Sequence, residues 1–64
     1  MKNKVKEYRG KEKMTQSELA EKSGISRNTI SAIETGNNTN ITCDVMEKIS
    51  KALNKKTSTI FFNE

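Results

Sequence analysis

The side chains best suited to specific hydrogen bonding lie close together in the middle of the chain. They are those of the adjacent residues Arg27 and Asn28. A guanidinium offers several donors in a fixed fork, and an amide offers a donor and an acceptor side by side. No nucleophile and base are spaced for catalysis. We therefore expect a binding protein and not an enzyme.

The residue types that build metal centres and disulfides are scarce. The 64 residues include no His and one cysteine, Cys43, so a zinc site or an intrachain disulfide is excluded. No metal, cofactor or small-molecule ligand is expected. Cys43 is interpreted as a small core residue, because no basic neighbour is evident to activate its thiol. A reducing, cytoplasmic location is the default for such a chain.

The net charge of the chain indicates which kinds of partner it can bind. The chain has 12 Lys and Arg residues against 8 Asp and Glu, a formal net charge of +4. A basic balance suits nucleic acid or an anionic membrane surface. No apolar run approaches the roughly 20 residues that span a bilayer, and we expect no membrane partner.

The helix that would present the central polar groups has two faces. Ser26 is a good N-cap, and Thr35 and Gly36 terminate the helix. At about 100° per residue, Ile30 and Ile33 point to one side. The other side carries Arg27, Asn28, Ser31 and Ala32, with Thr29 at the flank. The pattern predicts a helix that packs through isoleucines and exposes a polar face.

Another short helix precedes this one. Thr15 and Glu18 have the spacing of a capping box, and Met14 and Leu19 that of a hydrophobic staple. Gly24 then supplies the left-handed position that ends the helix. Two short helices joined by a tight turn are therefore expected.

A first helix is expected within residues 1–13. Val5, Tyr8 and the stem of Arg9 form its inward stripe. Its lysines either form a solvated face or attract phosphates diffusely.

Two helices are also expected after Thr42. The first has an inward stripe at spacings of three and four, made of Cys43, Met46, Ile49, Ser50 and Leu53. Asn54 stops it, and Thr57 is a candidate N-cap for a last turn over 58–62. A chain of this length forms one domain, residues 1–64.

The paired helices carry a family pattern. Residues 15–36 resemble the lambda-repressor-like helix-turn-helix family, also called the XRE or Cro/C1 type. The resemblance extends from about Val5 to Phe61. The matching positions are Gln16, Leu19, Ala20, Gly24, Ile25, Ser26, Ile30, Ser31, Ile33, Glu34 and Gly36.

The resemblance implies a compact all-α bundle of about five short helices, with the helix-turn-helix core at 15–36 and C-terminal helices at 42–62. The second helix would cross the DNA backbone and the third would enter the major groove. Proteins of this type usually bind pseudo-palindromic operators as homodimers. We therefore expect a transcriptional regulator that binds double-stranded DNA sequence-specifically and represses as a homodimer. The alternative is an antitoxin or another protein-interaction module in which DNA binding is secondary.

By the same resemblance, Arg27, Asn28 and Ala32 match the positions that read bases. Arg27 can donate two hydrogen bonds to guanine O6 and N7, and Asn28 can pair with adenine N6 and N7. Ala32 can touch only a thymine methyl. For Arg27, a phosphate contact from the start of the helix is the alternative.

Positions that match DNA-backbone contacts are Gln16, Thr29, Thr35, Asn37 and Asn38. Gln16 opens the second helix, where backbone N–H groups also meet a phosphate. Turn formation is an equally good explanation of Asn37 and Asn38. Thr15 is interpreted first as a cap.

The resemblance also implies a partly buried salt bridge between Arg9 and Glu34. We interpret it as structural, holding the first helix against the end of the third.

The chain departs from the family pattern at several positions. Cys43 stands where Leu is common, Ser50 where Ala is common, and Ile41 where Pro is frequent, and Lys55 occupies a usually apolar position. We expect the fourth and fifth helices to pack less tightly than usual.

Three large apolar side chains stand in a row at residues 60–62. Ile60, Phe61 and Phe62 cannot all face inward from one helical turn, so at least one should be exposed. We interpret the three as part of a two-fold homodimer interface. The alternative is core packing with one frayed aromatic.

Overall fold

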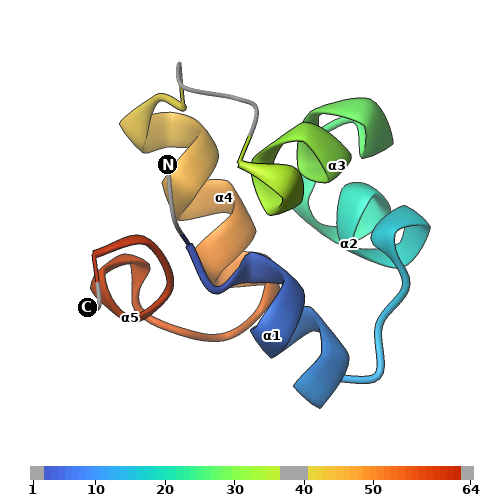
Figure 1. Cartoon of the computed structure of the whole chain (residues 1–64), viewed down its shortest axis with the longest axis horizontal. Helices are drawn as coiled ribbons and strands as arrows, with labels where there is room; N and C mark the ends of the chain where they lie inside the picture. The colour runs from blue at the N-terminus through green and yellow to red at the C-terminus, as the bar shows by residue number, and fades with distance from the viewer. Residues whose placement is uncertain (1–2, 37–40, 63–64) are drawn as a thin grey trace.

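The computed structural model of the chain describes residues 3–36 and 41–62, which form five α-helices and no strand. The helices are α1 (Val5–Lys11), α2 (Gln16–Ser23), α3 (Arg27–Thr35), α4 (Cys43–Ala52) and α5 (Thr57–Phe61). They form a bundle that measures 23 × 20 × 19 Å (Figure 1). This is the all-α fold expected from the sequence. No helix of the described residues is both long and apolar enough to cross a membrane.

Local hydrogen bonds fix the turn between α2 and α3. Thr15 Oγ1 accepts the backbone N–H of Glu18 at 3.0 Å, and the N–H of Thr15 donates to Glu18 Oε1 at 2.9 Å, so the expected capping box is present. Gly24 ends α2 with a φ of 75°, a conformation that side chains rarely tolerate. Ser26 then caps α3 by accepting the N–H of Thr29 at 3.2 Å. These signals all act within a few residues, which is why the turn could be predicted.

Every helix contributes apolar side chains to one core. The buried apolar residues are Val5, Met14, Leu19, Ile30, Ile33, Met46, Ile49, Leu53, Ile60 and Phe61. Ile30 and Ile33 are fully buried beneath α3. Burial of one such side chain stabilises the fold by roughly 1.5–3 kcal/mol, so these two anchor α3.

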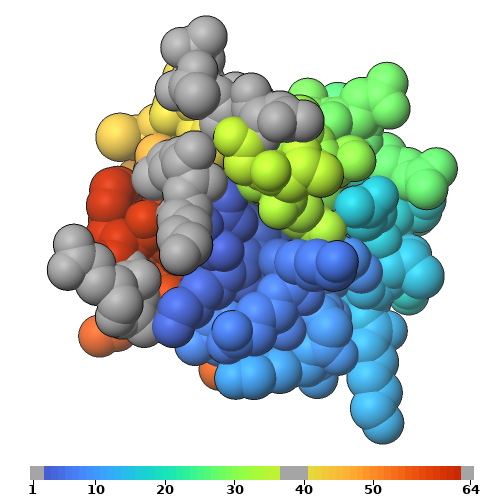
Figure 2. All heavy atoms as spheres, in the orientation of Figure 1, coloured from blue at the N-terminus to red at the C-terminus, as the bar shows by residue number. Residues whose placement is uncertain are grey.

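The helices pack around this core in a fixed order. α2 contacts α3 and α4, and α4 also contacts α5. Figure 2 shows the surface of α1 between those of α3 and α5, both of which α1 contacts. The backbone N–H of Lys4 donates to the carbonyl of Ile60 at 2.9 Å, which ties the start of α1 to α5.

Cys43 is exposed, so its interpretation as a core residue is wrong. The side chain of Thr42 caps α4 by accepting the N–H of Val45 at 3.2 Å, and Cys43 is therefore the first helical residue. Side chains lean toward the N-terminus of their own helix, so that of Cys43 extends beyond the end of the core. The buried residues of α4 are Met46, Ile49 and Ser50.

Ser50 places a hydroxyl inside the core. The residue is 2% exposed, and its Oγ has no hydrogen-bond partner among the described residues. An unpaired buried hydroxyl costs about 1–3 kcal/mol. The departure from the family's common Ala therefore lowers the stability of the bundle.

The last helix begins one residue earlier than expected. Lys56 occupies the N-cap position without a side-chain hydrogen bond, and Thr57 is already helical, so Thr57 is wrong as a cap. The turn closes when the N–H of Thr59 donates to the carbonyl of Lys56 at 3.0 Å. The main chain alone thus starts this helix.

Ile60 and Phe61 are core residues and not interface residues. Their exposed fractions are 1% and 4%, so their assignment to a dimer interface is wrong. α5 packs against both α1 and α4, and two adjacent side chains can therefore reach the core in different directions. Phe62, which follows the helix, is 60% exposed. One of the three side chains is thus exposed, as the sequence predicts.

Candidate nucleic-acid interface

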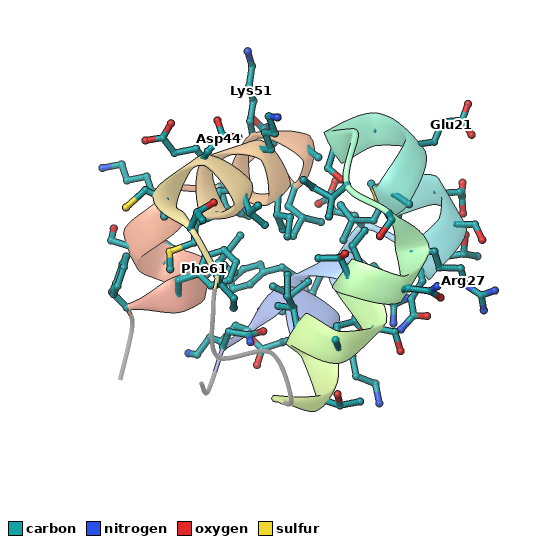
Figure 3. All side chains as sticks on the ribbon, turned by 90° about the horizontal axis from the view of Figure 1, so that it is seen from above. Glu21, Arg27, Asp44, Lys51 and Phe61 are labelled. Atoms are coloured by element: carbon teal, nitrogen blue, oxygen red, sulfur yellow. The ribbon has the colours of Figure 1, made fainter. Side chains whose placement is uncertain are left out.

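The outer side of α3 carries a polar face. Arg27 and Asn28 in its first turn are exposed, and so is Thr35 in its last. Ser31 and Ala32, between them, are half-buried. Figure 3 shows Arg27 extending from the bundle into solvent. The buried isoleucines on the opposite side of α3 hold this face outward.

The side chains of the first two residues of α3 carry strong hydrogen-bonding groups. Within residues 3–36 and 41–62, the side chains of Arg27 and Asn28 make no hydrogen bond or ion pair. The Thr35 hydroxyl donates to the carbonyl of Ala32 at 3.1 Å, so a phosphate would have to replace that carbonyl as the hydrogen-bond acceptor. The strongest uncommitted donors of the face therefore lie at the start of α3.

Thr29 lies off this face. It is half-buried, and its Oγ1 is 2.7 Å from Ser26 Oγ, while its N–H completes the cap of α3. The hydroxyl thus serves the start of the helix. Asn37 and Asn38, the other predicted backbone contacts near α3, lie outside the described residues.

The start of α2 offers a second group of donors. Gln16 is the first residue of the helix and is half-buried. The capping box uses the N–H groups of Thr15 and Glu18, so those of Gln16 and Ser17 remain at the positive end of α2. Free N–H groups in this position suit a phosphate oxygen.

The carboxylate of Glu34, at the end of α3, connects the start of α2 with α1. Arg9 Nε donates to Glu34 Oε2 at 2.7 Å, and Arg9 Nη2 donates to Glu34 Oε1 at 3.1 Å, which is the ion pair implied by the family resemblance. Gln16 Nε2 also donates to Oε1, at 3.1 Å. Arg9 Nη1 donates to the carbonyl of Met14 at 2.8 Å. The sequence did not predict the contact between Gln16 and Glu34, which lie 18 residues apart.

The ion pair is well shielded from solvent. The side chain of Glu34 is 3% exposed and that of Arg9 is 17% exposed. Burial by itself raises the pKa of Glu34, but the hydrogen bonds from Arg9 and Gln16 and the charges of Arg9 and Lys6 outweigh it, so the pKa lies below its ordinary value. The lowered pKa of Glu34 stabilises the fold at pH values above the pKa that this carboxyl has in the unfolded chain. The stabilisation is lost as pH falls through the pKa that the carboxyl has in the folded chain.

Two further residues of the site were not given a role from sequence. Asn3 Oδ1 accepts the N–H of Val5 at 3.1 Å, and its Nδ2 donates to the carbonyl of Ile33 at 2.9 Å, so it ties α1 to the end of α3. An Asn before a helix signals the first bond but not the second, whose partner is 30 residues away. Ser31 lies on the outer face between Arg27 and Thr35, and the spacing of four residues could have identified it.

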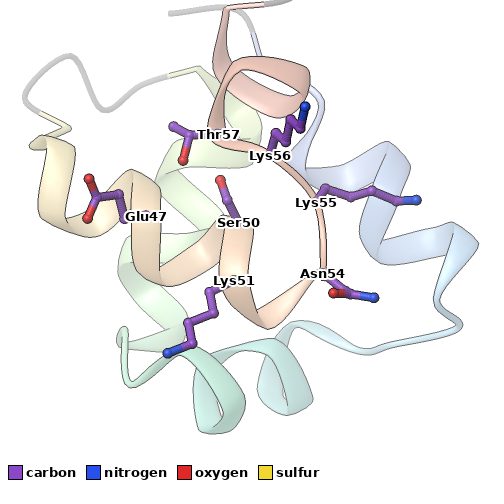
Figure 4. Close-up of a pocket in the computed structure, with 7 residues that line it drawn as sticks. All are labelled: Glu47, Ser50, Lys51, Asn54, Lys55, Lys56 and Thr57. Atoms are coloured by element: carbon purple, nitrogen blue, oxygen red, sulfur yellow. The ribbon is translucent and has the colours of Figure 1, made fainter.

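Three lysines lie around an open hollow between α4 and α5, away from the polar face of α3. Lys51, Lys55 and Lys56 border it, and Figure 4 shows their side chains pointing in different directions. Lys55 Nζ lies 5.7 Å from the centre of the Tyr8 ring. The three ammonium groups thus share no centre at which an anion would be held. No group of His, Cys, Asp and Glu among the described residues is arranged to hold a metal ion.

Comparison with known proteins shows the family of the chain. A helix-turn-helix family model matches residues 5–60. The chain belongs to the lambda-repressor-like helix-turn-helix family. One relative in this family, an uncharacterised HTH-type transcriptional regulator of Methanocaldococcus jannaschii, is 58% identical over 36 residues. That match covers 56% of this chain and 54% of the relative, about half of its length.

A second relative matches over more of its length. It is an uncharacterised HTH-type transcriptional regulator of Archaeoglobus fulgidus, 39% identical over 61 residues. The match covers 95% of this chain and 84% of that protein. The similarity thus extends over all five helices and not only over the helix-turn-helix.

The buried ion pair leads to a prediction about stability. Glu34→Gln should lower the free energy of unfolding by about 3 kcal/mol, because Arg9 keeps its charge and loses the negative charge that compensates it. Urea denaturation at pH 7 measures this change. Asp44→Asn is the matched control, because it removes the same charge from an exposed pair with Lys48 at 3.1 Å and should change stability little. Equal stability of Glu34→Gln and wild type would contradict the structural role.

Proposed function

We propose that this chain is a sequence-specific DNA-binding regulator of transcription, which places α3 in the major groove. The observation that carries the proposal is the outer face of α3, where Arg27 and Asn28 are exposed and make no hydrogen bond within the described residues. The major groove is wide enough to admit a helix, and its base edges present distinct patterns of donors and acceptors. The names of the two relatives, both HTH-type transcriptional regulators, support the same function.

The side chains on α3 divide the task of reading bases. Arg27 donates two hydrogen bonds to guanine, Asn28 pairs with adenine, and Ala32 contacts a thymine methyl. Each good bidentate contact discriminates between bases by roughly 1–3 kcal/mol. Ser31, between them, has a hydroxyl that can bond to either kind of edge.

Contacts at both ends of the helix-turn-helix position α3 on the duplex. Gln16 and the free N–H groups at the start of α2 bind one phosphate. Thr29 and Thr35, near the start and the end of α3, contact other phosphates, as do Asn37 and Asn38, which follow α3 in the sequence. Backbone contacts of this kind set orientation and register but carry no sequence information of their own.

The size of the bundle favours action as a homodimer. Successive major-groove faces lie about 34 Å apart along DNA, whereas the longest dimension of the bundle is 23 Å. One copy therefore reads a single groove and few bases. Two copies related by a two-fold axis read a pseudo-palindromic operator, and their occupancy of a promoter represses transcription.

The base-reading role can be tested with DNA from upstream of the protein's own gene. Footprinting and gel shifts across a salt series should reveal binding that survives competitor DNA. Arg27→Ala should weaken binding to the operator by about tenfold or more, and base preference should relax at one position of each half-site.

Lys48→Ala is the matched control, because it removes one positive charge from the exposed face of α4. It should leave base preference unchanged. If Arg27→Ala instead weakens binding to all duplexes alike and lowers the salt slope by about one, Arg27 contacts a phosphate and does not read a base.

The homodimer has its own test. Phe62 is the exposed large apolar side chain of the described residues, and we place it in the interface. Wild-type protein should sediment as a dimer at micromolar concentration, and Phe62→Ser should shift it toward monomer and weaken operator binding. A wild-type chain that stays monomeric, both free and on operator DNA, would contradict this part of the proposal.

A further inference from the structure

We infer that Glu34 is a positioning residue for DNA-backbone binding: it orients the amide of Gln16 so that one N–H of that amide faces a phosphate. The inference rests on the proposed function, in which Gln16 contacts the backbone. It assigns to Glu34, beyond its pairing with Arg9, an effect on a ligand contact made by another residue.

The chemistry of the contact determines which way the amide points. An ionised carboxylate can only accept hydrogen bonds, so Nε2 of Gln16, and not its Oε1, must face Glu34. The observed bond from Nε2 to Glu34 Oε1 is 3.1 Å long. The same nitrogen carries a second N–H. Since a phosphate oxygen also accepts only, this second N–H is the part of the Gln16 side chain that can bind it.

Both ends of the contact are held in place. Glu34 is fixed by two hydrogen bonds from Arg9, at 2.7 Å and 3.1 Å, and its side chain is 3% exposed. Arg9 also donates to the carbonyl of Met14 at 2.8 Å, two residues before Gln16. Gln16 itself lies within the capping box, directly after the cap residue Thr15. The amide is therefore ordered before any DNA arrives, which lowers the entropy cost of binding.

The surrounding charge makes the arrangement compatible with an anionic ligand. A lone carboxylate beside a phosphate would repel it. Here the guanidinium of Arg9 contacts both oxygens of Glu34, and Lys6 adds a further positive charge nearby. Glu34 can thus orient Gln16 without leaving net negative charge at the phosphate site.

Glu34→Gln separates orientation from packing, because it keeps the size of the side chain. The carbonyl of a glutamine at position 34 would face Arg9, the charged and closer donor, and its NH₂ group would face Gln16. Gln16 would then turn its own oxygen inward, and its donors would no longer be set for the phosphate.

A double-mutant cycle on a fixed operator duplex tests this coupling, at a temperature where circular dichroism shows every variant to be folded. Gln16→Ala should weaken binding about tenfold in the wild-type background and less than about twofold in the Glu34→Gln background. Asp44→Asn is the matched background. It removes one negative charge from α4, on the side of the bundle away from Arg27 in Figure 3, and should leave the tenfold effect intact.

An NMR measurement on the wild-type chain needs no stable Glu34 variant. Gln16 is the only glutamine in the sequence, so selective ¹⁵N-glutamine labelling gives one side-chain NH₂ pair. In the free protein, one proton of this pair should be shifted downfield and protected from exchange, and the other should shift when duplex is added. Two protons that both behave as a free amide would overturn the inference.

The outcomes distinguish a failure of the proposed function from a failure of the positioning role of Glu34. If wild-type protein binds no duplex, the proposed function fails and the inference fails with it. If wild type binds and Gln16→Ala has the same effect in both backgrounds, the proposed function stands. Glu34 is then structural only.

Discussion

One buried carboxylate sets the geometry of the helix-turn-helix in this protein. The Glu34 side chain is 3% exposed, and a carboxylate in such a place needs hydrogen-bond donors and a compensating charge. Arg9 from α1 supplies both, and Gln16 from α2 supplies one more donor. The apolar core gives most of the stability but little direction, because hydrophobic burial is non-directional. The hydrogen bonds and the positive charge that Glu34 requires therefore determine how the end of α1, the start of α2 and the end of α3 meet.

The same helix that carries this carboxylate also presents the face that we assign to DNA. Ile30 and Ile33 anchor α3 in the core, Glu34 ties its end to α1 and α2, and Arg27 and Asn28 extend from its other side. Structural and recognition roles thus fall on different faces of nine residues. In so small a bundle, the groups that hold α3 are also the groups that place the start of α2 beside it. The positions of the two surfaces that we propose to read bases and to bind phosphate are therefore linked.

Sequence reasoning succeeded where the cause lies within a few residues. The capping box of Thr15, the left-handed Gly24 and the two faces of α3 depend on local spacing, and the structure confirms them. It failed where contacts between helices determine whether a side chain is buried and which partner it bonds to. Cys43 falls on the inward side of α4 by periodicity, but it lies at the helix start, beyond the core. Phe61 is buried because α5 contacts two helices at once, and the bond from Gln16 to Glu34 joins separate helices. The Arg9–Glu34 pair was expected only through the family resemblance.

An NMR titration of uniformly ¹⁵N-labelled protein with operator duplex tests directly whether the outer face of α3 enters the major groove. We expect the largest shift changes at Arg27, Asn28, Ser31 and Thr35 and at Gln16, at the start of α2. Changes concentrated at Lys51, Lys55 and Lys56, with α3 unaffected, would contradict this expectation, because the hollow between α4 and α5 would then be the surface that meets DNA.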